Sequence, residues 1–347
     1  MIDNTIVHSD IEDIFVLSGG GARGLYQFHV VQLLTELGYK PKMLIGTSAG
    51  TLNSFAIAKG LIKETYALYD VVGKTNGAPI TKPLIAKITD QGLKPDKEAI
   101  LSTLLKGINI WDAPKLIFKK SREKLFQQLL QNASNIKSLM SNEPLIETVT
   151  KLHELKSTFD IPFFLNVVSL TTGKLVQLSP DDFDNPNELI KAVVASTTIP
   201  IIWQDIPTFK TKTNQYFRLA DSGLRESSPL AGLFDQMRPD KYYRIWVINC
   251  NRREMVDDNE LDNLLQIGGR MASIMLNELL ITDLQRTIEI NELALKFGDK
   301  ISKRYVPINI IEYSGNRGVF DFNEASFAEQ LITAKEDVSK FLSQNVQ

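Results

Sequence analysis

The chain of 347 residues contains little cysteine, little histidine and no long apolar run. Cys250 is its only cysteine, so no disulfide can form within the chain and nothing marks an oxidising compartment. Residues 1–5 lack the basic start and apolar stretch of a secretory signal, and no run approaches the roughly 18 apolar residues of a membrane helix. We therefore expect a cytoplasmic protein, with peripheral contact with a membrane left open.

The charge balance is close to neutral. A formal net charge of −2 offers no basic excess that would attract nucleic acid, so we expect no nucleic-acid partner. Hydrophobic residues at 43% and charged residues at 23% are ordinary for a globular protein, and the length suffices for one large or two smaller domains. There is no cluster of histidine and cysteine and no H-E-x-x-H pattern, so we expect neither metal nor cofactor. Oligomerisation stays open.

Glycine is concentrated in two short segments near the N-terminus. The first follows the apolar run 14–17 and consists of Gly19, Gly20, Gly21, Ala22, Arg23 and Gly24. The second follows the apolar residues 43–45 and consists of Gly46, Thr47, Ser48, Ala49 and Gly50. A serine between two glycines after a strand is typical of a nucleophile elbow, and a glycine triplet at a strand-to-helix turn offers backbone N–H groups to an oxyanion. Together they indicate a serine acyl hydrolase.

Alternating strands and helices surround these segments. Apolar spacing predicts strands over 14–17 and 43–45, each followed by a helix, over 24–37 and 49–59. This alternation predicts an α/β fold with a mostly parallel sheet between layers of helices. Further strands are expected over 161–168, 175–178, 216–219, 243–248 and 305–311.

The middle and the end of the chain are predicted to be helical. Residues 73–142 are interpreted as an insertion of short helices over 97–105, 115–131 and 136–140 that forms a cap over the sheet. A helix is expected over 187–196, a long one over 261–297 with a break near Gly268 and Gly269, and a closing one over 327–342.

The serine needs a base within hydrogen-bond reach. None of the three histidines, His8, His29 and His153, follows a late strand, where a hydrolase histidine is expected, so a triad is disfavoured. A carboxylate shielded from water can replace histidine. Asp221 is the first candidate because Ser222 and Gly223 follow it, as in a tight loop at a sheet edge; Asp205 is the second. On spacing alone, Asp221 is equally well a turn residue.

The glycine triplet also fits a dinucleotide site. Such sites require an acidic residue roughly twenty positions further on, at the end of the second strand. Residues 37–41 contain no carboxylate, so an NAD-binding protein is a distant alternative.

In this order, the glycine loop, the elbow and the aspartate loop resemble the patatin-like phospholipase family, whose motifs are G-G-G-x-[RK]-G, G-x-S-x-G and D-G-[GA]. Residues 19–24 and 46–50 match the first two in full. The segments 171–176 and 195–200 are similar to family segments as well, and the likeness covers about 13–60 and 160–225. The third motif departs from the pattern because Ser222 stands where the family has glycine.

The resemblance implies a three-layer α/β/α fold and a lipid acyl hydrolase with a Ser–Asp dyad. Ser48 would be the nucleophile, Asp221 the base, and the backbone of Gly19, Gly20 and Gly21 the oxyanion hole, with Arg23 and Gly24 completing the loop. Arg23 either adds positive charge for the oxyanion or a phosphate, or lies on the surface. We expect one domain over 1–347, with a core over about 12–225, the insertion over about 73–142 and a C-terminal sheet and helix region over about 240–347.

The implied substrate is a phospholipid or another acyl ester. The alternatives are an esterase or thioesterase acting on soluble acyl substrates, and a non-catalytic lipid-binding or interaction module. Residues 111–126 mix basic and bulky apolar side chains, which fits either docking on an anionic membrane or a cap helix with a core face; we favour the cap helix.

Overall fold

The computed structural model describes residues 11–89, 92–108, 119–226, 229–230, 232–238, 240–251, 264–301 and 305–345. Its main sheet has eight strands in the order β12-β11-β1-β2-β7-β10-β9, with β8 paired to β7. The strands are β1 (Ile11–Leu17), β2 (Pro41–Gly46), β7 (Phe163–Ser169), β8 (Leu175–Leu178), β9 (Ile206–Lys210), β10 (Gln215–Asp221), β11 (Tyr242–Asn249) and β12 (Ile308–Glu312). The run from β12 to β7 is parallel, whereas β8, β9 and β10 pair antiparallel with their neighbours.

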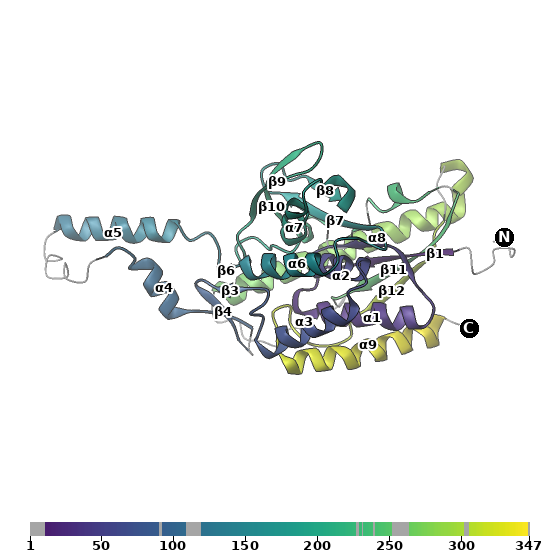
Figure 1. Cartoon of the computed structure of the whole chain (residues 1–347), viewed down its shortest axis with the longest axis horizontal. Coiled ribbons are helices and arrows are strands. Elements are labelled where there is room, and N and C mark those ends of the chain that lie inside the picture. The colour runs from purple at the N-terminus through teal and green to yellow at the C-terminus, as the bar shows by residue number, and fades with distance from the viewer. Residues whose placement is uncertain are drawn as a thin grey trace.

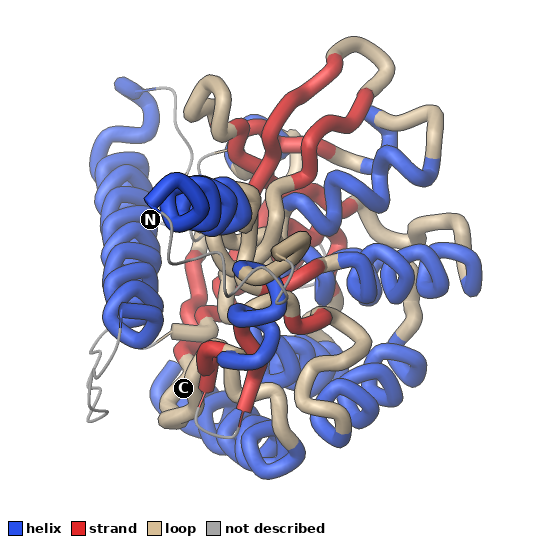
Figure 2. Tube along the Cα trace, turned by 90° about the vertical axis from the view of Figure 1, so that its left-hand side faces the viewer, coloured by secondary structure: helices blue, strands red, loops and turns tan. Residues whose placement is uncertain are grey.

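Helices cover both faces of this sheet. Among the described residues, the helices are α1 (Gly24–Glu36), α2 (Ala49–Ala58), α3 (Ile62–Lys74), α4 (Lys97–Leu104), α5 (Lys119–Ser134), α6 (Glu143–Leu155), α7 (Pro186–Ala195), α8 (Leu264–Ile301) and α9 (Glu324–Asn345), of which α4 and α5 do not lie on the sheet. Figure 1 places α1, α3 and α9 on one side of the strands, and Figure 2 shows the strands between helices. The predicted three-layer α/β/α fold with a mostly parallel sheet is therefore confirmed.

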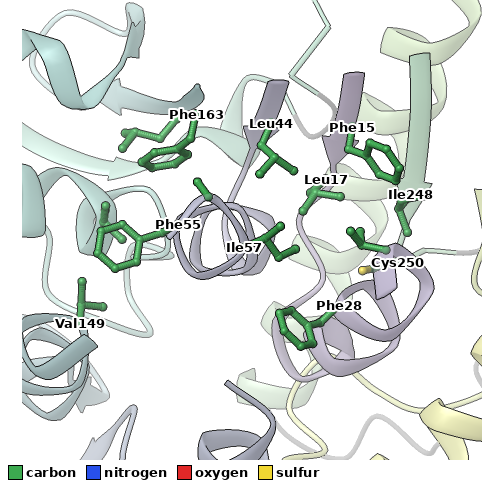
Figure 3. Packing of buried hydrophobic residues seen from close by; sticks show 14 of the residues in the cluster. Phe15, Leu17, Phe28, Leu44, Phe55, Ile57, Val149, Phe163, Ile248 and Cys250 are labelled. Atoms are coloured by element: carbon green, nitrogen blue, oxygen red, sulfur yellow. The ribbon is translucent and has the colours of Figure 1, made fainter. Parts of the chain in front are cut away.

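Strand β1 shows why the sheet has two packed faces. Its side chains alternate, so Phe15 and Leu17 join a core with α1 and α2, while Ile14 and Val16 join a second core with α8. Figure 3 shows the first core, where Phe28 and Ile57 from the helices face Leu17 and Leu44 from the strands. Buried on both faces, β1 and β2 hold their C-terminal ends side by side.

The insertion differs from its prediction. Two short strand pairs, β3 (Lys82–Pro83) with β6 (Met140–Ser141) and β4 (Ala86–Thr89) with β5 (Gly92–Pro95), form its base. The expected helix over 136–140 is wrong, because residues 136–138 form no regular element and Met140 pairs with Pro83 as a strand residue and bridges to Trp203. Helices α4 and α5 extend away from the sheet in Figure 1 rather than forming a cap over it. Residues 111–118 of the basic segment lie outside the described residues.

The long C-terminal helix also differs from its prediction. Helix α8 continues through Gly268 and Gly269, where we expected a break, and its non-helical backbone lies at Phe297. No helix in the part of the chain that the structure describes is both long and apolar enough to cross a membrane.

Candidate active site

Ser48 lies at the sharp turn between β2 and α2. Its backbone has φ 55° and ψ −127°, a conformation that residues other than glycine rarely adopt. The flanking glycines are required by close packing: a Cβ on Gly46 would lie 2.3 Å from the oxygen of Gly50, and one on Gly50 would lie 2.1 Å from the oxygen of Leu17. The turn therefore has the strained geometry of a nucleophile elbow.

Asp221 ends strand β10 and is almost fully buried. Its carboxylate accepts hydrogen bonds from the Ser48 side chain and from the Gly223 amide, the latter at 2.8 Å. Burial raises the pKa of Asp221 to about 6, although both hydrogen bonds act to lower it. Strands β10 and β2 both pair with β7, which explains how residues so distant in the sequence meet.

The segment after α7 holds both residues by their backbones. The Ser48 amide donates to the oxygen of Ser196 at 3.1 Å, and the Asp221 amide donates to the oxygen of Thr198 at 2.9 Å. This segment includes the residues 195–200 that resemble a family segment. The serine and the aspartate are therefore both held by the backbone of this one segment.

Ser222 fits the aspartate loop without strain. It does not have a positive φ, so the position does not require glycine, and its buried hydroxyl donates to Thr47 Oγ1 at 3.3 Å. The departure from the D-G-[GA] pattern therefore leaves the loop geometry intact.

The glycine loop runs alongside the serine. A Cβ on Gly19 would lie 3.2 Å from the Cβ of Ser48. The amides of Gly19, Gly20 and Gly21 make no hydrogen bond to any residue that the structure describes. Free backbone N–H groups beside a nucleophile are suited to binding negative charge.

Two C-terminal segments press against this loop. A Cβ on Gly20 would lie 2.3 Å from the Cβ of Cys250, and one on Gly21, whose φ is +55°, would lie 2.4 Å from the oxygen of Val319. The Ala22 amide donates to that same Val319 oxygen at 2.9 Å. The loop is thus held by two segments from the C-terminal part of the chain.

Arg23 joins these segments to one another. Its guanidinium donates to the oxygen of Arg317 at 2.6 Å, and to the oxygen of Cys250 and Oδ1 of Asn251 at 3.1 and 2.8 Å. Asn251 in turn donates to the oxygen of Gly19 at 3.3 Å. Arg23 is therefore neither a free surface residue nor aimed at open space.

A sequence model of the patatin-like phospholipase family matches residues 15–234, which include the serine, the aspartate and the glycine loop. The chain belongs to the patatin-like phospholipase family. A search of curated protein sequences found no match.

Solved structures similar to this patatin-like chain include two bacterial proteins. VipD from Legionella pneumophila has a TM-score of 0.39 and 15% identity, over 96% of this chain and 67% of that one. The type III effector ExoU has a TM-score of 0.32 and 12% identity, over 96% of this chain and 53% of that one. The patatin-like chain therefore spans about two thirds of the length of VipD and about half of that of ExoU.

The other candidate bases of the patatin-like chain lie elsewhere. Asp205 forms an ion pair with Arg218, whose Nη2 is 2.9 Å from its Oδ1. His29 contacts the Tyr66 hydroxyl at 2.7 Å and His153 contacts the Lys59 amine at 3.0 Å; burial is the main cause that lowers the pKa of each histidine. His8 lies outside the described residues.

Sequence reasoning missed the polar residues behind the glycine loop. Gln27 donates to the oxygens of Ser18 and Ile248, and Asn53 donates to the oxygen of Gly24 at 2.8 Å. Gln330 of α9 joins the same patch through the oxygen of Ala22. Asn53 follows the elbow motif and offered a weak signal, whereas Gln330 and Asn251 offered none.

Proposed function

We propose that this patatin-like protein hydrolyses acyl-ester bonds of phospholipids, with Ser48 as nucleophile and Asp221 as base. One observation carries the proposal: a serine with strained backbone is hydrogen-bonded to a buried carboxylate, beside a loop of glycine amides that have no partner among the described residues. At the level of the family, the chain is a lipid hydrolase.

The chemistry needs two half-reactions. Ser48 Oγ attacks the ester carbonyl carbon while its proton passes to Asp221, and the carbonyl oxygen becomes an oxyanion. Collapse expels the alcohol, which takes the proton from Asp221, and leaves an acyl group on Ser48. Water then attacks this acyl-enzyme, again giving its proton to Asp221, and the fatty acid leaves as the serine recovers the proton.

Burial suits Asp221 to this work. An ordinary exposed aspartate is too weak a base, whereas burial raises the pKa of Asp221 to about 6 and keeps it mostly ionised at neutral pH. The Gly223 amide donates to Oδ1 of the carboxylate and so fixes its orientation. A dyad needs no histidine under these conditions.

The oxyanion would be held by the amides of Gly19, Gly20 and Gly21, supported by Gly24 and Arg23. Gly24 is the first residue of α1. A Cβ at this position would lie 2.5 Å from the Tyr69 hydroxyl, so the close packing requires glycine. Because the Arg23 guanidinium binds two carbonyl oxygens and Asn251, we assign it the positioning of the loop rather than direct contact with the oxyanion.

The test is Ser48→Ala, compared with Ser54→Ala, a buried serine of the same helix whose hydroxyl has no partner among the described residues. We expect Ser48→Ala to lower fatty-acid release from phospholipid vesicles by at least about ten-thousand-fold, and Ser54→Ala to have little effect. Mass spectrometry of the products measures the release, and circular dichroism checks folding.

Three outcomes would contradict the proposal. Full activity of Ser48→Ala would remove Ser48 as nucleophile. Hydrolysis of soluble p-nitrophenyl esters without release from vesicles would replace phospholipids by soluble acyl esters as substrates. If a fluorophosphonate failed to label Ser48, the site would be a non-catalytic binding module.

A further inference from the structure

Helices α4 and α5 form an arm that contributes nothing to the protein core. Among the side chains that the structure describes in these two helices, none is buried. Four large apolar side chains are instead strongly exposed: Leu101 (57%), Leu105 (39%), Phe126 (61%) and Leu130 (53%). Figure 1 shows the arm extending from the body on the side of β3, β4 and β6.

The exposed apolar residues lie on helix faces that no described segment covers. On α5, Gln128 and Asn132 donate to backbone oxygens at the end of α4, so this face contacts the other helix. Phe126 lies two residues before Gln128, and Leu130 lies two residues before Asn132. Two residues correspond to a rotation of about 200° around the helix at 100° per residue, so both apolar side chains face away from α4. On α4, Lys97 and Leu101 are four residues apart, so the exposed lysine shares a face with the exposed leucine.

The arm is basic although the chain is not. Residues 97–108 and 119–134 contain six lysines and arginines against two glutamates, whereas the whole chain has a net charge of −2. The side chains of Lys97, Lys106 and Lys124 are exposed. Exposed apolar side chains together with lysines are the composition of helices that bind anionic lipid surfaces.

The base of the arm contacts the segment that holds the candidate catalytic residues. The amides of Leu139 and Met140 donate to the oxygens of Ile201 and Ile202 at 2.9 and 2.8 Å. A few residues earlier, the same segment binds the backbones of Ser48 and Asp221 through Ser196 and Thr198. The arm is therefore connected to the site through this one segment of the chain.

We propose that the α4–α5 arm docks on an anionic lipid surface and so brings the site to its substrate. The purpose of docking rests on the proposed function, whereas the observations that support docking do not depend on it. A second copy of the chain is a poorer occupant, because pairing two arms would bring two basic surfaces together. An anionic membrane would bury the apolar side chains and attract the lysines at the same time.

The experiment uses the inactive Ser48→Ala protein, so that binding is measured without hydrolysis. We expect it to co-sediment with vesicles of phosphatidylcholine and phosphatidylglycerol, and much less with phosphatidylcholine alone. Adding Leu101→Ser with Phe126→Ser, or Lys97→Glu with Lys106→Glu, should weaken binding to the anionic vesicles at least about tenfold.

Matched variants control for general loss of apolar surface or charge. Leu37→Ser with Ile332→Ser removes two side chains of similar exposure, 53% and 59%, and Lys40→Glu with Lys42→Glu reverses two exposed lysines at the start of β2. Both controls should bind as the parent does. Equal binding by the arm variants, or no binding of the parent to either vesicle, would overturn the proposal.

Soluble-ester hydrolysis by the arm variants, made with Ser48 intact, separates the two proposals. If the arm variants lose vesicle binding but hydrolyse a soluble ester normally, docking is supported and distinct from catalysis. If the protein binds vesicles through the arm but releases no fatty acid, the proposed function fails while docking stands.

Discussion

At the scale of single residues, the proposed dyad depends on an aspartate whose charge is costly to bury. Asp221 has no arginine or lysine among the causes that set its pKa; only the Ser48 side chain and the Gly223 amide favour its ionised form. A histidine triad divides the tasks of base and orienting carboxylate between two residues. In the proposed dyad, the Gly223 amide orients the carboxylate directly, so that Asp221 alone would perform both tasks.

The raised pKa of Asp221 predicts how activity depends on pH. A base must be deprotonated, so kcat/KM for a soluble ester should be constant above pH 7 and fall tenfold per pH unit well below pH 6. A pH–rate profile between pH 4 and 9 measures this. Asp221→Asn should be inactive at every pH, whereas Asp205→Asn should retain the parental profile. A histidine base elsewhere would show itself if Asp221→Asn kept substantial activity.

At the scale of elements, the glycine loop depends on glycine for two different reasons. Gly20 has φ −168°, an extended backbone open to any residue, so only the nearby Cys250 side chain excludes a Cβ there. Gly21 has a positive φ and meets the backbone oxygen of Val319, which no side-chain change can move away. The two glycines should therefore respond differently to a compensating substitution.

The double variant Gly20→Ala with Cys250→Gly tests this difference. Gly20→Ala alone should lower kcat about a hundredfold, because the loop must shift and misplace an oxyanion donor. Adding Cys250→Gly removes the Cβ that clashes with the new alanine side chain, so kcat should rise at least tenfold above that of the single variant Gly20→Ala. Gly21→Ala with Cys250→Gly is the control and should show no recovery; recovery there would mean that Cys250→Gly acts by loosening the whole loop.

The same elements show which parts of the fold are local enough to predict. Gly46 and Gly50 stand at close approaches within one β–α turn, so their spacing predicts the turn correctly. The segment 136–140 has helical spacing, but its last residue, Met140, pairs with Pro83 and bridges to Trp203, partners that its own sequence does not reveal. Gly268 and Gly269 each disfavour a helix by only about 1 kcal/mol, too little to break one as long as α8.

At the scale of the whole molecule, the candidate site is completed by residues beyond the family match. The match ends at residue 234, yet Cys250, Asn251, Arg317 and Val319 all contact the glycine loop or Arg23. The hydrogen bond between Arg23 and Asn251 joins residues 228 positions apart, which no local pattern records. This is why the glycine motif was predictable while its support was not.

Gln330 of α9 makes this dependence measurable. Its fully buried side chain accepts from the Tyr26 amide at 3.0 Å and donates to the oxygen of Ala22 at 3.1 Å, satisfying a free amide in the first turn of α1. Gln330→Leu leaves both groups buried without partners, so we expect the free energy of unfolding to fall by about 2–4 kcal/mol in urea denaturation. Because Ala22 belongs to the glycine loop, kcat should fall as well, at temperatures where the variant is still folded.

The matched control is Gln344→Leu, an exposed glutamine of the same helix, which should change neither quantity. If Gln330→Leu lowered stability but left kcat unchanged, α9 would support α1 without governing the loop. A fall in both quantities would mean that the region beyond residue 234 is part of the catalytic apparatus. An isolated fragment limited to the family match would then lack the support that fixes its oxyanion donors.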